Sequence, residues 1–409
     1  MAFAKRTIDS VPLHGKTVLL RADYNVPLND DGTIADDFRI RSSLPTVKKL
    51  LDMGCKVVCV SHLGRPDGRP NPKYSLEPAA QRLAELLGEP VRFVDETISH
   101  KAEMAVKRAP SRGVIMLENL RFDSREEAND FEFAERLARV SQADYFVQDG
   151  FGVVHRAHAS TSAITQYLPS VAGLLLEREV DTITNAMVSP KRPLLAVLGG
   201  AKVSDKIAVI EALVDVADRI FIGGAMANTF FAKCGVNMGK SKFETDQYDV
   251  IDRIYDRVRA KVGEDAINDF LVLPDDLEVS ETLTPAADEP RRIVLRDGVG
   301  ENDIALDIGD TTIERLAGFV RESGTVIWNG TLGMAETIQF ANGSARLSLE
   351  LAIHPEITSI VGGGDTADFV INWDARHGDS FTHVSTGGGA SLELMAGQKL
   401  PGVEALLDA

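Results

Sequence analysis

The chain has 409 residues, 44% of them hydrophobic and 26% charged, which is the balance of a globular protein long enough for two domains. Its formal net charge of −17 argues against binding to nucleic acid or an anionic membrane through the overall field. The sequence has neither an apolar run of about 18 residues nor a charged-then-apolar leader, so we expect a cytoplasmic protein.

Predicted strands are short β-branched runs, each followed by a loop and then a helical pattern. In the first half they are Val18–Arg21, Val57–Ser61, Val91–Phe93, Val114–Leu117 and Tyr145–Gln148. In the second half they are Leu194–Leu198, Arg219–Ile222, Leu271–Pro274, Ala305–Asp307, Val326–Trp328, Ser359–Val361 and His383–Ser385. Amphipathic stretches such as Leu76–Leu87, Phe131–Val140 and Lys206–Val216 lie between them. Such alternation predicts parallel sheets covered by helices on both faces.

Cys55 and Cys59 fall on one predicted strand. Their Cα atoms would lie roughly 13 Å apart, too far for a disulfide. We therefore expect buried thiols in a reducing compartment.

A domain boundary is predicted where the strand–helix alternation pauses. Leu174–Val188 has a helical pattern without a strand of its own, and it ends in the proline-bracketed segment Ser189–Pro193. The predicted fold class is α/β, with two Rossmann-like parallel-sheet domains (three-layer αβα), a central cleft and a hinge helix. We assign 1–173 to the first domain, 174–188 to the hinge helix, 189–388 to the second domain and 389–409 to a C-terminal segment.

The loops after the strands differ between the halves, and ligands of α/β sheets bind at these carboxyl ends. The first half ends its strands in cations, acids and histidines: Arg21 to Asn25, Ser61 to Pro66, Glu118 to Arg121, and Asp149 to His158. The second half ends its strands in glycine: Gly199–Gly200, Gly223–Gly224, Gly330 to Gly333, Gly362 to Gly364 and Gly387 to Gly389.

Glycine runs that open helices expose backbone N–H groups, which suits phosphate. The familiar nucleotide fingerprints fail here. Gly235 to Ser241 is one residue short of a P-loop, and Gly362 to Ala367 fits G-x-G-x-x-A but lacks the acid expected about 20 residues later. The pattern predicts a nucleotide phosphate site of another lineage.

Converging arginines suit an anion with several acidic groups. The alternative for each arginine is a surface ion pair. His155 and His158 have a spacing that zinc could use, but they lack a third ligand at helical spacing. His62 could be a general base, although a charged or hydrogen-donating histidine on the same anion fits the neighbouring arginines better.

Eight motifs together resemble the phosphoglycerate kinase family. The first, Arg21 to Pro27 (RADYNVP), is similar to the family's R-x-D-[FY]-N-V-P signature. The others are SHLGRP at Ser61, LENLRF at Leu117, HRAH at His155, LGGAKV at Leu198, WNG at Trp328, GGGDT at Gly362 and STGGGAS at Ser385. They occur in the family's order over almost the whole chain. Thr331 departs from the family pattern, because many members have proline there.

The resemblance implies a role for each matched residue. The phosphoglycerate site would comprise Asp23, Asn25, Arg39, His62, Arg65, Arg121 and Arg156, with Arg21 holding the site in place. The nucleotide site would comprise Gly200, Lys202, Lys206, Gly223, Gly224, Asn329, Glu336, Gly362, Gly363, Gly364, Asp365 and Thr366. Within these sets the ribose contact would be Glu336 and the metal ligand Asp365. The catalytic groups would be Arg39, Lys202, Lys206 and the backbone N–H groups of Gly364 and Gly389.

The implied activity is reversible, Mg²⁺-dependent phosphoryl transfer between 1,3-bisphosphoglycerate with ADP and 3-phosphoglycerate with ATP, in glycolysis and gluconeogenesis. We expect charge neutralisation and domain closure rather than a general base. We also expect the segment 389–409 to return to the first domain, and we expect a monomer without nucleic-acid or membrane partners. A Rossmann-type dehydrogenase and a non-enzymatic anion-binding protein are the alternatives. The first leaves the arginines unexplained, and the second leaves the lysines beside glycine turns unexplained.

Overall fold

The computed structural model describes residues 3–286 and 289–409. They form two compact units, residues 3–181 with 399–409 and residues 182–286 with 289–398. No helix in these described ranges is long and apolar enough to cross a membrane.

Unit 1 is built on a six-stranded parallel sheet in the order β3-β4-β2-β1-β5-β6. Its strands are β1 (Thr17–Arg21), β2 (Lys56–Val60), β3 (Val91–Val94), β4 (Gly113–Leu117), β5 (Tyr145–Gln148) and β6 (Ser170–Ala172). Its helices are α1 (Phe38–Asp52), α2 (Glu77–Leu87), α3 (His100–Arg108), α4 (Phe131–Ser141), α14 (Pro401–Glu404) and the start of α5 (Leu174–Val188). Short 3₁₀ turns are η1 (Pro72–Tyr74), η2 (Leu120–Phe122), η3 (Phe151–Val153) and η4 (Ala163–Gln166).

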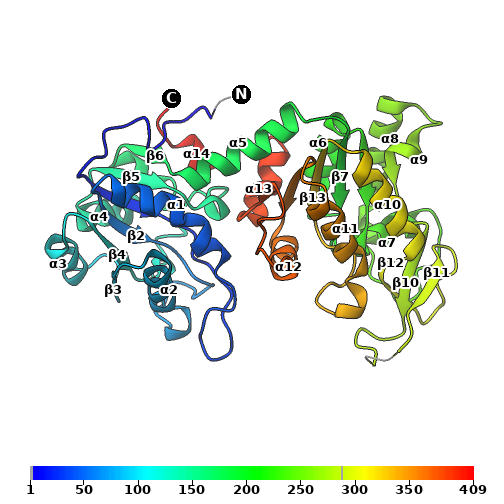
Figure 1. Cartoon of the computed structure of the whole chain (residues 1–409), viewed down its shortest axis with the longest axis horizontal. Coiled ribbons are helices and arrows are strands. Elements are labelled where there is room, and N and C mark those ends of the chain that lie inside the picture. The colour runs from blue at the N-terminus through cyan, green and yellow to red at the C-terminus, as the bar shows by residue number, and fades with distance from the viewer. Residues whose placement is uncertain (1–2, 287–288) are drawn as a thin grey trace. The chain divides into compact units, whose positions relative to one another are not determined.

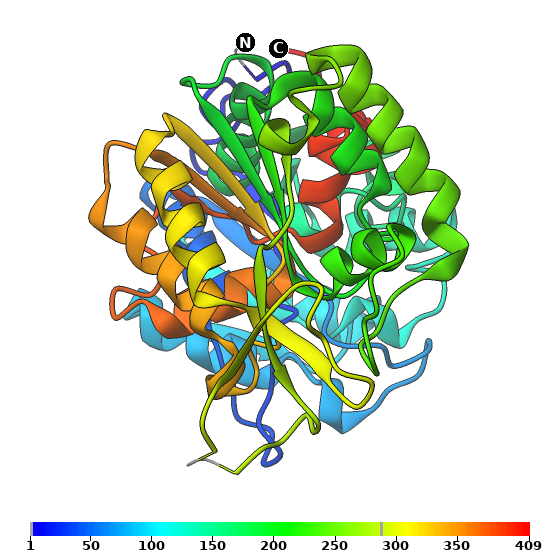
Figure 2. The same cartoon turned by 90° about the vertical axis from the view of Figure 1, so that its right-hand side faces the viewer.

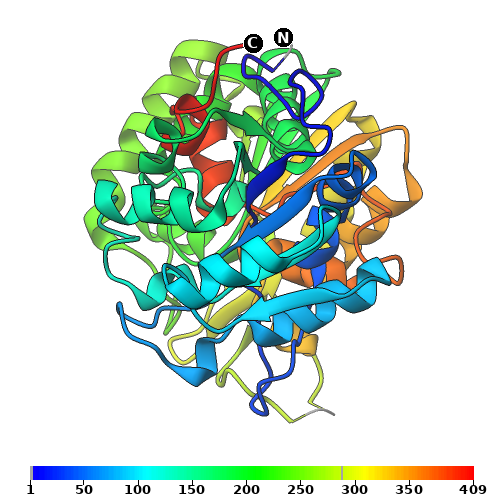
Figure 3. The same ribbon diagram turned by 90° about the vertical axis from the view of Figure 1, so that its left-hand side faces the viewer.

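Both faces of the unit 1 sheet are buried, as its apolar strands require. Val18 and Leu20 of β1 pack into one core with residues of α1 and α2, whereas Leu19 packs into the other core with α3 and α4. This alternation places one pair of helices on each face (Figures 1 and 3). Cys55 and Cys59 are buried free thiols in the first core, which confirms that they form no disulfide.

Two distant parts of the sequence complete unit 1. Residues 399–409 run beside the N-terminal segment, where Lys5 and Asp408 form an antiparallel bridge and Ala409 N donates to Ala4 O at 3.1 Å (Figure 1). Further along, Gly402 N donates to Val154 O at 2.8 Å, and Leu407 N donates to Ser170 O at 3.0 Å. The unit is therefore discontinuous in sequence.

Unit 2 has a six-stranded parallel sheet and a smaller antiparallel one. The large sheet runs β15-β14-β13-β7-β8-β9, and the small sheet runs β11-β10-β12. The strands are β7 (Leu194–Leu198), β8 (Arg219–Ile222), β9 (Leu271–Val272), β10 (Asp276–Ser280), β11 (Arg292–Leu295), β12 (Ile304–Ile308), β13 (Thr325–Asn329), β14 (Thr358–Gly362) and β15 (His383–Val384).

Helices cover both faces of the large sheet of unit 2. One layer contains α10 (Asp310–Glu322), α11 (Asn342–Ile353) and α12 (Gly364–Trp373) (Figure 2). The other contains α6 (Ile207–Val216), α7 (Gly224–Lys233), α8 (Tyr248–Val262) and α13 (Gly388–Met395). The remaining short helical elements are α9 (Ile267–Phe270), η5 (Thr245–Gln247) and η6 (Ile338–Phe340).

The two parallel sheets confirm the predicted fold class, but three strands were missed. β6 is only three residues long, whereas β10 and β11 form most of the antiparallel sheet. β10 carries the buried acids Asp276 and Glu278, a polar pattern that is unusual in a strand buried along its length. Ala305–Asp307, predicted as part of the parallel alternation, is the core of β12 and pairs with β10.

Candidate functional site

The predicted cations of unit 1 come together at one edge of its sheet. We call Arg21, Asp23, Arg39, His62, Arg121 and Arg156 the basic cluster. β4, β2, β1 and β5 are adjacent parallel strands, so the loops after them meet at their carboxyl ends. Arg21 ends β1, His62 follows β2, and Arg121 lies in η2 after β4.

Asp23 organises the outer part of the basic cluster. Its carboxylate is 4% exposed, and it accepts hydrogen bonds from Arg39 Nη1 at 2.7 Å and from Asn25 N at 3.1 Å. The Asn25 side chain in turn accepts from Gly64 N at 2.8 Å, and Arg121 Nη1 donates to Gly64 O at 3.0 Å. The loops after β1, β2 and β4 are thus hydrogen-bonded to one another.

His62 is buried beside several positive charges. Burial lowers its pKa well below the ordinary histidine value, and the guanidinium groups of Arg21, Arg121 and Arg39 lower it further. Burial, followed by the charges of Arg21, Arg121 and Arg156, lowers the pKa of His158 to about 4. Because the charges of Arg21 and Arg121 lower the pKa of both histidines, the cations must lie close together. Their charges also favour the neutral form of both imidazoles. A positively charged His62, one of the two forms predicted from the sequence, is therefore disfavoured. The other form, a neutral His62 that donates a hydrogen bond, remains.

Two of the predicted arginines of unit 1, one of them a member of the basic cluster, lie at its surface. Arg65 is exposed on the loop after Gly64, and Arg156 is exposed with its Nε donating to His155 Nε2 at 3.1 Å. Within the described part of the chain, no three His, Cys, Asp or Glu side chains are grouped closely enough to hold a metal ion. The spacing of His155 and His158 therefore gains no third ligand.

Sequence reasoning missed two buried residues behind the basic cluster, Glu126 and Ser160. Ser160 N and Ser160 Oγ both donate to the Glu126 carboxylate, at 3.0 and 2.5 Å, and Arg21 Nε donates to Ser160 Oγ at 2.8 Å. Neither residue ends a strand, so the strand-end rule could not find them. A glutamate in the turn after Arg121 and a serine after the HRAH motif were the only available signals.

In unit 2 the predicted glycines bring three strand-end loops into backbone contact. We call Gly199, Gly200, Gly223, Gly224, Gly330, Gly363 and Gly364 the glycine cradle. Gly199 N donates to Asn329 O at 3.0 Å, and Gly200 N donates to Thr331 O at 2.8 Å. A Cβ on Gly330 would lie 2.2 Å from Gly199 O, and Gly330 also has φ +96°. No other residue type fits this close approach.

Three helices of unit 2 begin at glycines and have no side-chain cap. The helices α7, α12 and α13 begin after Gly223, Gly363 and Gly387, and none of these residues supplies a capping hydrogen bond from a side chain. A Cβ on Gly388 would lie 3.6 Å from Gly364 N, so the starts of α12 and α13 are neighbours. Two positive helix ends side by side form an anion site made of backbone.

Polar side chains complete this site. Lys206 Nζ donates to Gly199 O at 2.9 Å, and burial lowers the pKa of Lys206 to about 8 despite the opposing charges of Asp205 and Asp365. Asn329 is buried, and its Nδ2 has no hydrogen-bond partner among the described residues. An unsatisfied buried donor of this kind points to a missing acceptor, such as a phosphate oxygen. Lys202 is exposed, and Thr366 Oγ1 accepts from Gly330 N at 2.7 Å.

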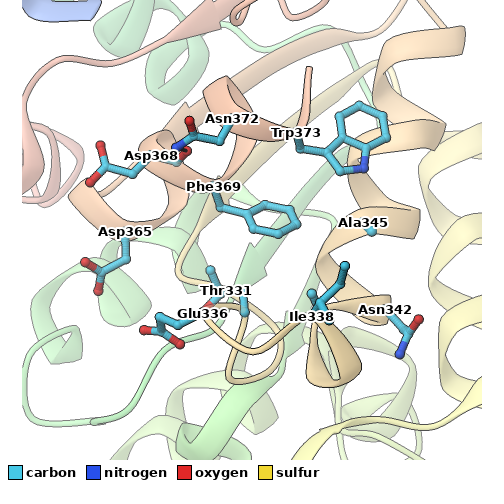
Figure 4. A pocket seen from close by; sticks show the side chains of 12 residues that line it. Thr331, Glu336, Ile338, Asn342, Ala345, Asp365, Asp368, Phe369, Asn372 and Trp373 are labelled. Carbon is cyan, nitrogen blue, oxygen red and sulfur yellow. Dashed lines mark hydrogen bonds between the residues drawn. The ribbon is translucent and has the colours of Figure 1, made fainter. Parts of the chain in front are cut away.

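Two cavities flank Glu336 and Asp365 in unit 2. The larger, of about 680 Å³, lies between α11 and α12, with the ring of Phe369 projecting into it toward Ala345 (Figure 4). The smaller, of about 400 Å³, is lined by Gly200, Gly224, Leu306, Gly333 and Met334 among others. Glu336, Asp365 and Thr331 line both cavities. The cavities therefore provide space for a nucleoside beside the glycine cradle.

Asp365 is an exposed carboxylate in the first turn of α12, and its charge acts on Lys206. No dedicated cage of metal ligands surrounds it in the described ranges. Mg²⁺ commonly takes one or two carboxylates, with the other ligands coming from substrate phosphates and water. The donor set therefore fits Mg²⁺ delivered with a nucleotide.

Comparisons with known proteins agree on one family. The family model described as "Phosphoglycerate kinase" matches residues 8–398. The chain is 43% identical over 406 residues to the phosphoglycerate kinase of Fervidobacterium nodosum, covering 99% of this chain and 98% of the relative. It is 46% identical over 410 residues to that of Chloroflexus aurantiacus, covering 99% of each. Among solved structures, the phosphoglycerate kinase of Coxiella burnetii matches with a TM-score of 0.82 and 34% identity over 98% of both chains.

Proposed function

The chain belongs to the phosphoglycerate kinase family and is a phosphotransferase with a carboxyl group as acceptor, and we propose that its two units divide the substrates between them. In this proposal the basic cluster, with Asn25 and Arg65, binds phosphoglycerate. The glycine cradle, with Lys202, Lys206, Asn329, Glu336, Gly362, Asp365 and Thr366, binds ATP or ADP.

One observation carries the proposal: each unit gathers groups that suit an anion, and the groups are of a different kind in each. In unit 1, Arg39 pairs with the buried carboxylate of Asp23, whose charge also acts on Arg21 and Arg121. In unit 2, uncapped helix starts lie beside Lys206. The buried amide nitrogen of Asn329 also lies there, and it has no hydrogen-bond partner among the described residues. A substrate with a carboxylate and a phosphate suits the first site, and a polyphosphate suits the second.

We propose a mechanism without a general base. The acceptor in the ATP-consuming direction is a carboxylate, which is ionised near neutral pH, so no proton has to be removed. Catalysis then rests on position and charge. Arg39 and Lys202 neutralise the oxygens of the transferring phosphoryl group, the N–H groups of Gly364 and Gly389 donate to it, and Lys206 holds the terminal phosphates.

We further propose that the reaction depends on Mg²⁺. Asp365 would hold the ion directly or through water, and the bound ion would supply charge neutralisation at the nucleotide phosphates. The variant Asp365→Asn tests this contact, because asparagine keeps the shape of the side chain and removes its charge.

Transfer needs groups from both units at one phosphoryl group, so we propose a closing motion at the helix α5. Closure would also exclude water and so limit hydrolysis. One chain carries both sets of residues, so a monomer suffices. In the cell the reaction would serve glycolysis and gluconeogenesis.

The test is an assay of ATP consumption that requires 3-phosphoglycerate and Mg²⁺, with Arg39→Ala and Lys202→Ala as variants. We expect wild-type turnover only with all three components, and a fall in kcat of roughly 10²- to 10⁴-fold in each variant.

Matched controls remove one exposed cation from each unit. Arg112 forms an exposed ion pair with Glu89, and Lys233 pairs with Asp252 at the far end of α7. Arg112→Ala and Lys233→Ala should leave turnover within about twofold. Wild-type turnover without 3-phosphoglycerate would contradict the proposed substrate. A change in KM alone in Arg39→Ala would contradict its transition-state role.

A further inference from the structure

Behind the basic cluster, four buried residues form one continuous hydrogen-bonded chain. It runs from Glu126 through Ser160 and Arg21 to His62, and each of these residues is less than 5% exposed. All four lie in unit 1, on the turn before α4, the loop after η3, the end of β1 and the loop after β2.

The direction of each hydrogen bond in this chain is fixed. Ser160 Oγ has a single hydrogen, and the Glu126 carboxylate 2.5 Å away can only accept it, provided that the carboxylate is ionised. Ser160 Oγ therefore accepts from Arg21 Nε, at 2.8 Å. Arginine has no acceptor atom, so Arg21 Nη2 must donate to His62 Nδ1, at 3.2 Å. With Nδ1 as acceptor, the hydrogen of a neutral His62 is on Nε2.

Glu126 supplies the charge that this arrangement needs. Arg21 is 1% exposed, and burial lowers its pKa, while Glu126 is the largest opposing influence, ahead of Asp23. Burial raises the pKa of Glu126, and the charge of Arg21 is the first of the influences that lower it. Ser160 lies between the two charged groups and links them, because its hydroxyl donates to Glu126 and accepts from Arg21.

Other charged groups face His62 as well, and most of them favour the neutral ring. Its charged or titratable neighbours are Arg21, Asp23, Arg39, Arg121 and His158. Among these described neighbours, only Asp23 would favour the imidazolium, and its Oδ1 lies 4.0 Å from His62 Nδ1. Arg21 is nearer to that nitrogen, at 3.2 Å, and occupies its lone pair.

We propose that Glu126 is a positioning residue which, through Ser160 and Arg21, holds His62 as the neutral Nε2–H tautomer. His62 then offers the substrate one N–H donor that does not titrate in the physiological range. The role of His62 in substrate binding rests on the proposed function, whereas its tautomer does not.

The test reads the tautomer directly in the substrate-free protein. The protein is labelled with ¹⁵N-histidine, and the variant His62→Gln identifies the His62 resonances among the eight histidines. In the wild type we expect an Nε2–H pattern that is constant between pH 6 and 8. Ser160→Ala removes the link while keeping Glu126 and Arg21, and we expect mixed tautomers or a titration within that range.

The kinetic readout is the KM for 3-phosphoglycerate. A donor that contacts ground and transition states equally affects KM and not kcat. We therefore expect KM to rise roughly 5- to 30-fold in Ser160→Ala and in Glu126→Gln, with kcat within about twofold. Ser141→Ala is the matched control. Ser141 is also fully buried, but its hydroxyl donates to Ala138 O on α4.

Three results would overturn the proposal: a charged or Nδ1–H His62 in the wild type, an unchanged tautomer in both Ser160→Ala and Glu126→Gln, or KM values that match the Ser141→Ala control. If one variant does not fold, the other gives the same reading. If His62 is the Nε2–H tautomer but the protein has no 3-phosphoglycerate-dependent turnover, the positioning role of Glu126 is supported and the proposed function is rejected. The failure of one proposal can therefore be told from the failure of the other.

Discussion

In the proposed function, units 1 and 2 bind anions through different chemical groups. Unit 1 uses side-chain cations that have acidic partners: Asp23 for the half-buried Arg39, and Glu126 through Ser160 for the buried Arg21. Unit 2 uses backbone N–H groups at helix starts, which bring no net charge into the interior. What this arrangement requires is space, because the three loops approach so closely that a side chain larger than that of glycine would overlap backbone atoms. Unit 1 should therefore be sensitive to changes of charge, and unit 2 to any added atom.

The largest effect should come from adding one carbon to the glycine cradle. In Gly330→Ala the new Cβ would overlap Gly199 O, and the φ of +96° disfavours alanine. We expect kcat/KM to fall by at least about 10³-fold and the protein to be destabilised by about 3 kcal/mol or more. Steady-state kinetics and thermal unfolding measure the two effects.

Gly318→Ala is the control for that variant. Gly318 lies within α10, its φ is not positive, and a Cβ there would meet nothing within 4 Å. Alanine should stabilise the helix by up to about 1 kcal/mol and leave turnover unchanged. Equal effects of the two substitutions would contradict the steric account of unit 2.

The next largest effect concerns Lys206, the half-buried cation beside the glycine cradle. Lys206→Met should lower kcat/KM by roughly 10²- to 10³-fold, because a charge at the terminal phosphates is lost. Burial lowers the pKa of Lys206 to about 8, so the free protein loses this charge above that pH. The Kd for ADP should therefore rise by up to about tenfold between pH 7.5 and 9.

Calorimetric titration of wild type and Lys206→Arg checks this dependence. Arginine stays charged over the whole range, so its Kd for ADP should vary little with pH. A wild-type Kd that is as constant as that of the arginine variant would show that Lys206 does not titrate in this window.

A smaller effect is expected from removing a charge in unit 1 without changing its shape. Asp23→Asn leaves Arg39 without its carboxylate partner at 2.7 Å. We expect kcat/KM to fall by roughly 10- to 100-fold, with the loss partly recovered at low ionic strength. Asp123→Asn is the control, because that carboxylate pairs with the surface residue Arg125. Equal losses in both variants would contradict the special position of Asp23.

The smallest effect compares one buried acid from each unit. Burial raises the pKa of Asp149 and of Asp307 to about 7. Their carboxylates accept backbone N–H groups, at the start of α5 from Leu175 and Leu176 and at the start of α11 from Gly343. A folded-state pKa above the unfolded value means that stability is highest at low pH and is lost as pH rises through about 7.

Chemical denaturation at pH 5 and pH 7 tests both acids. Each should reduce the free energy of unfolding by about 1 to 2 kcal/mol over this interval. Asp149→Asn and Asp307→Asn should each remove that part of the slope, whereas the exposed Asp256→Asn should leave it unchanged. A slope that is unaffected by either buried substitution would show that these acids do not titrate as proposed.

The sequence predicted the large sheets well because buried parallel strands have a local signature. Runs such as Leu194–Leu198 are wholly apolar, and the observed bounds of β7 and α5 coincide with the predicted ones. β10 was missed because its acids are satisfied by distant partners. Thr312 Oγ1 donates to Asp276 at 2.6 Å, and Arg291 pairs with Glu278 at 2.8 Å. No local pattern reveals such compensation.

The candidate site divides in the same way. Arg21, His62 and Arg121 follow strands directly, so topology alone predicts that they converge. Glu126 and Ser160 reach Arg21 only because the turn before α4 and the loop after η3 fold against each other, where Ala159 N donates to Glu126 O at 2.9 Å. Long-range loop packing of this kind is set by the whole fold and not by a local pattern.

The discontinuity of unit 1 has a consequence for synthesis on the ribosome. Ser170 and Val154 receive hydrogen bonds from Leu407 and Gly402, which are translated only after all of Thr182–Gln398. Unit 2 is continuous and can complete its fold as it emerges. Unit 1 lacks the hydrogen bonds made by residues 399–409 until that segment has been translated. The half-finished chain therefore exposes its nascent first unit to chaperones and proteases for the whole time that the second is being made.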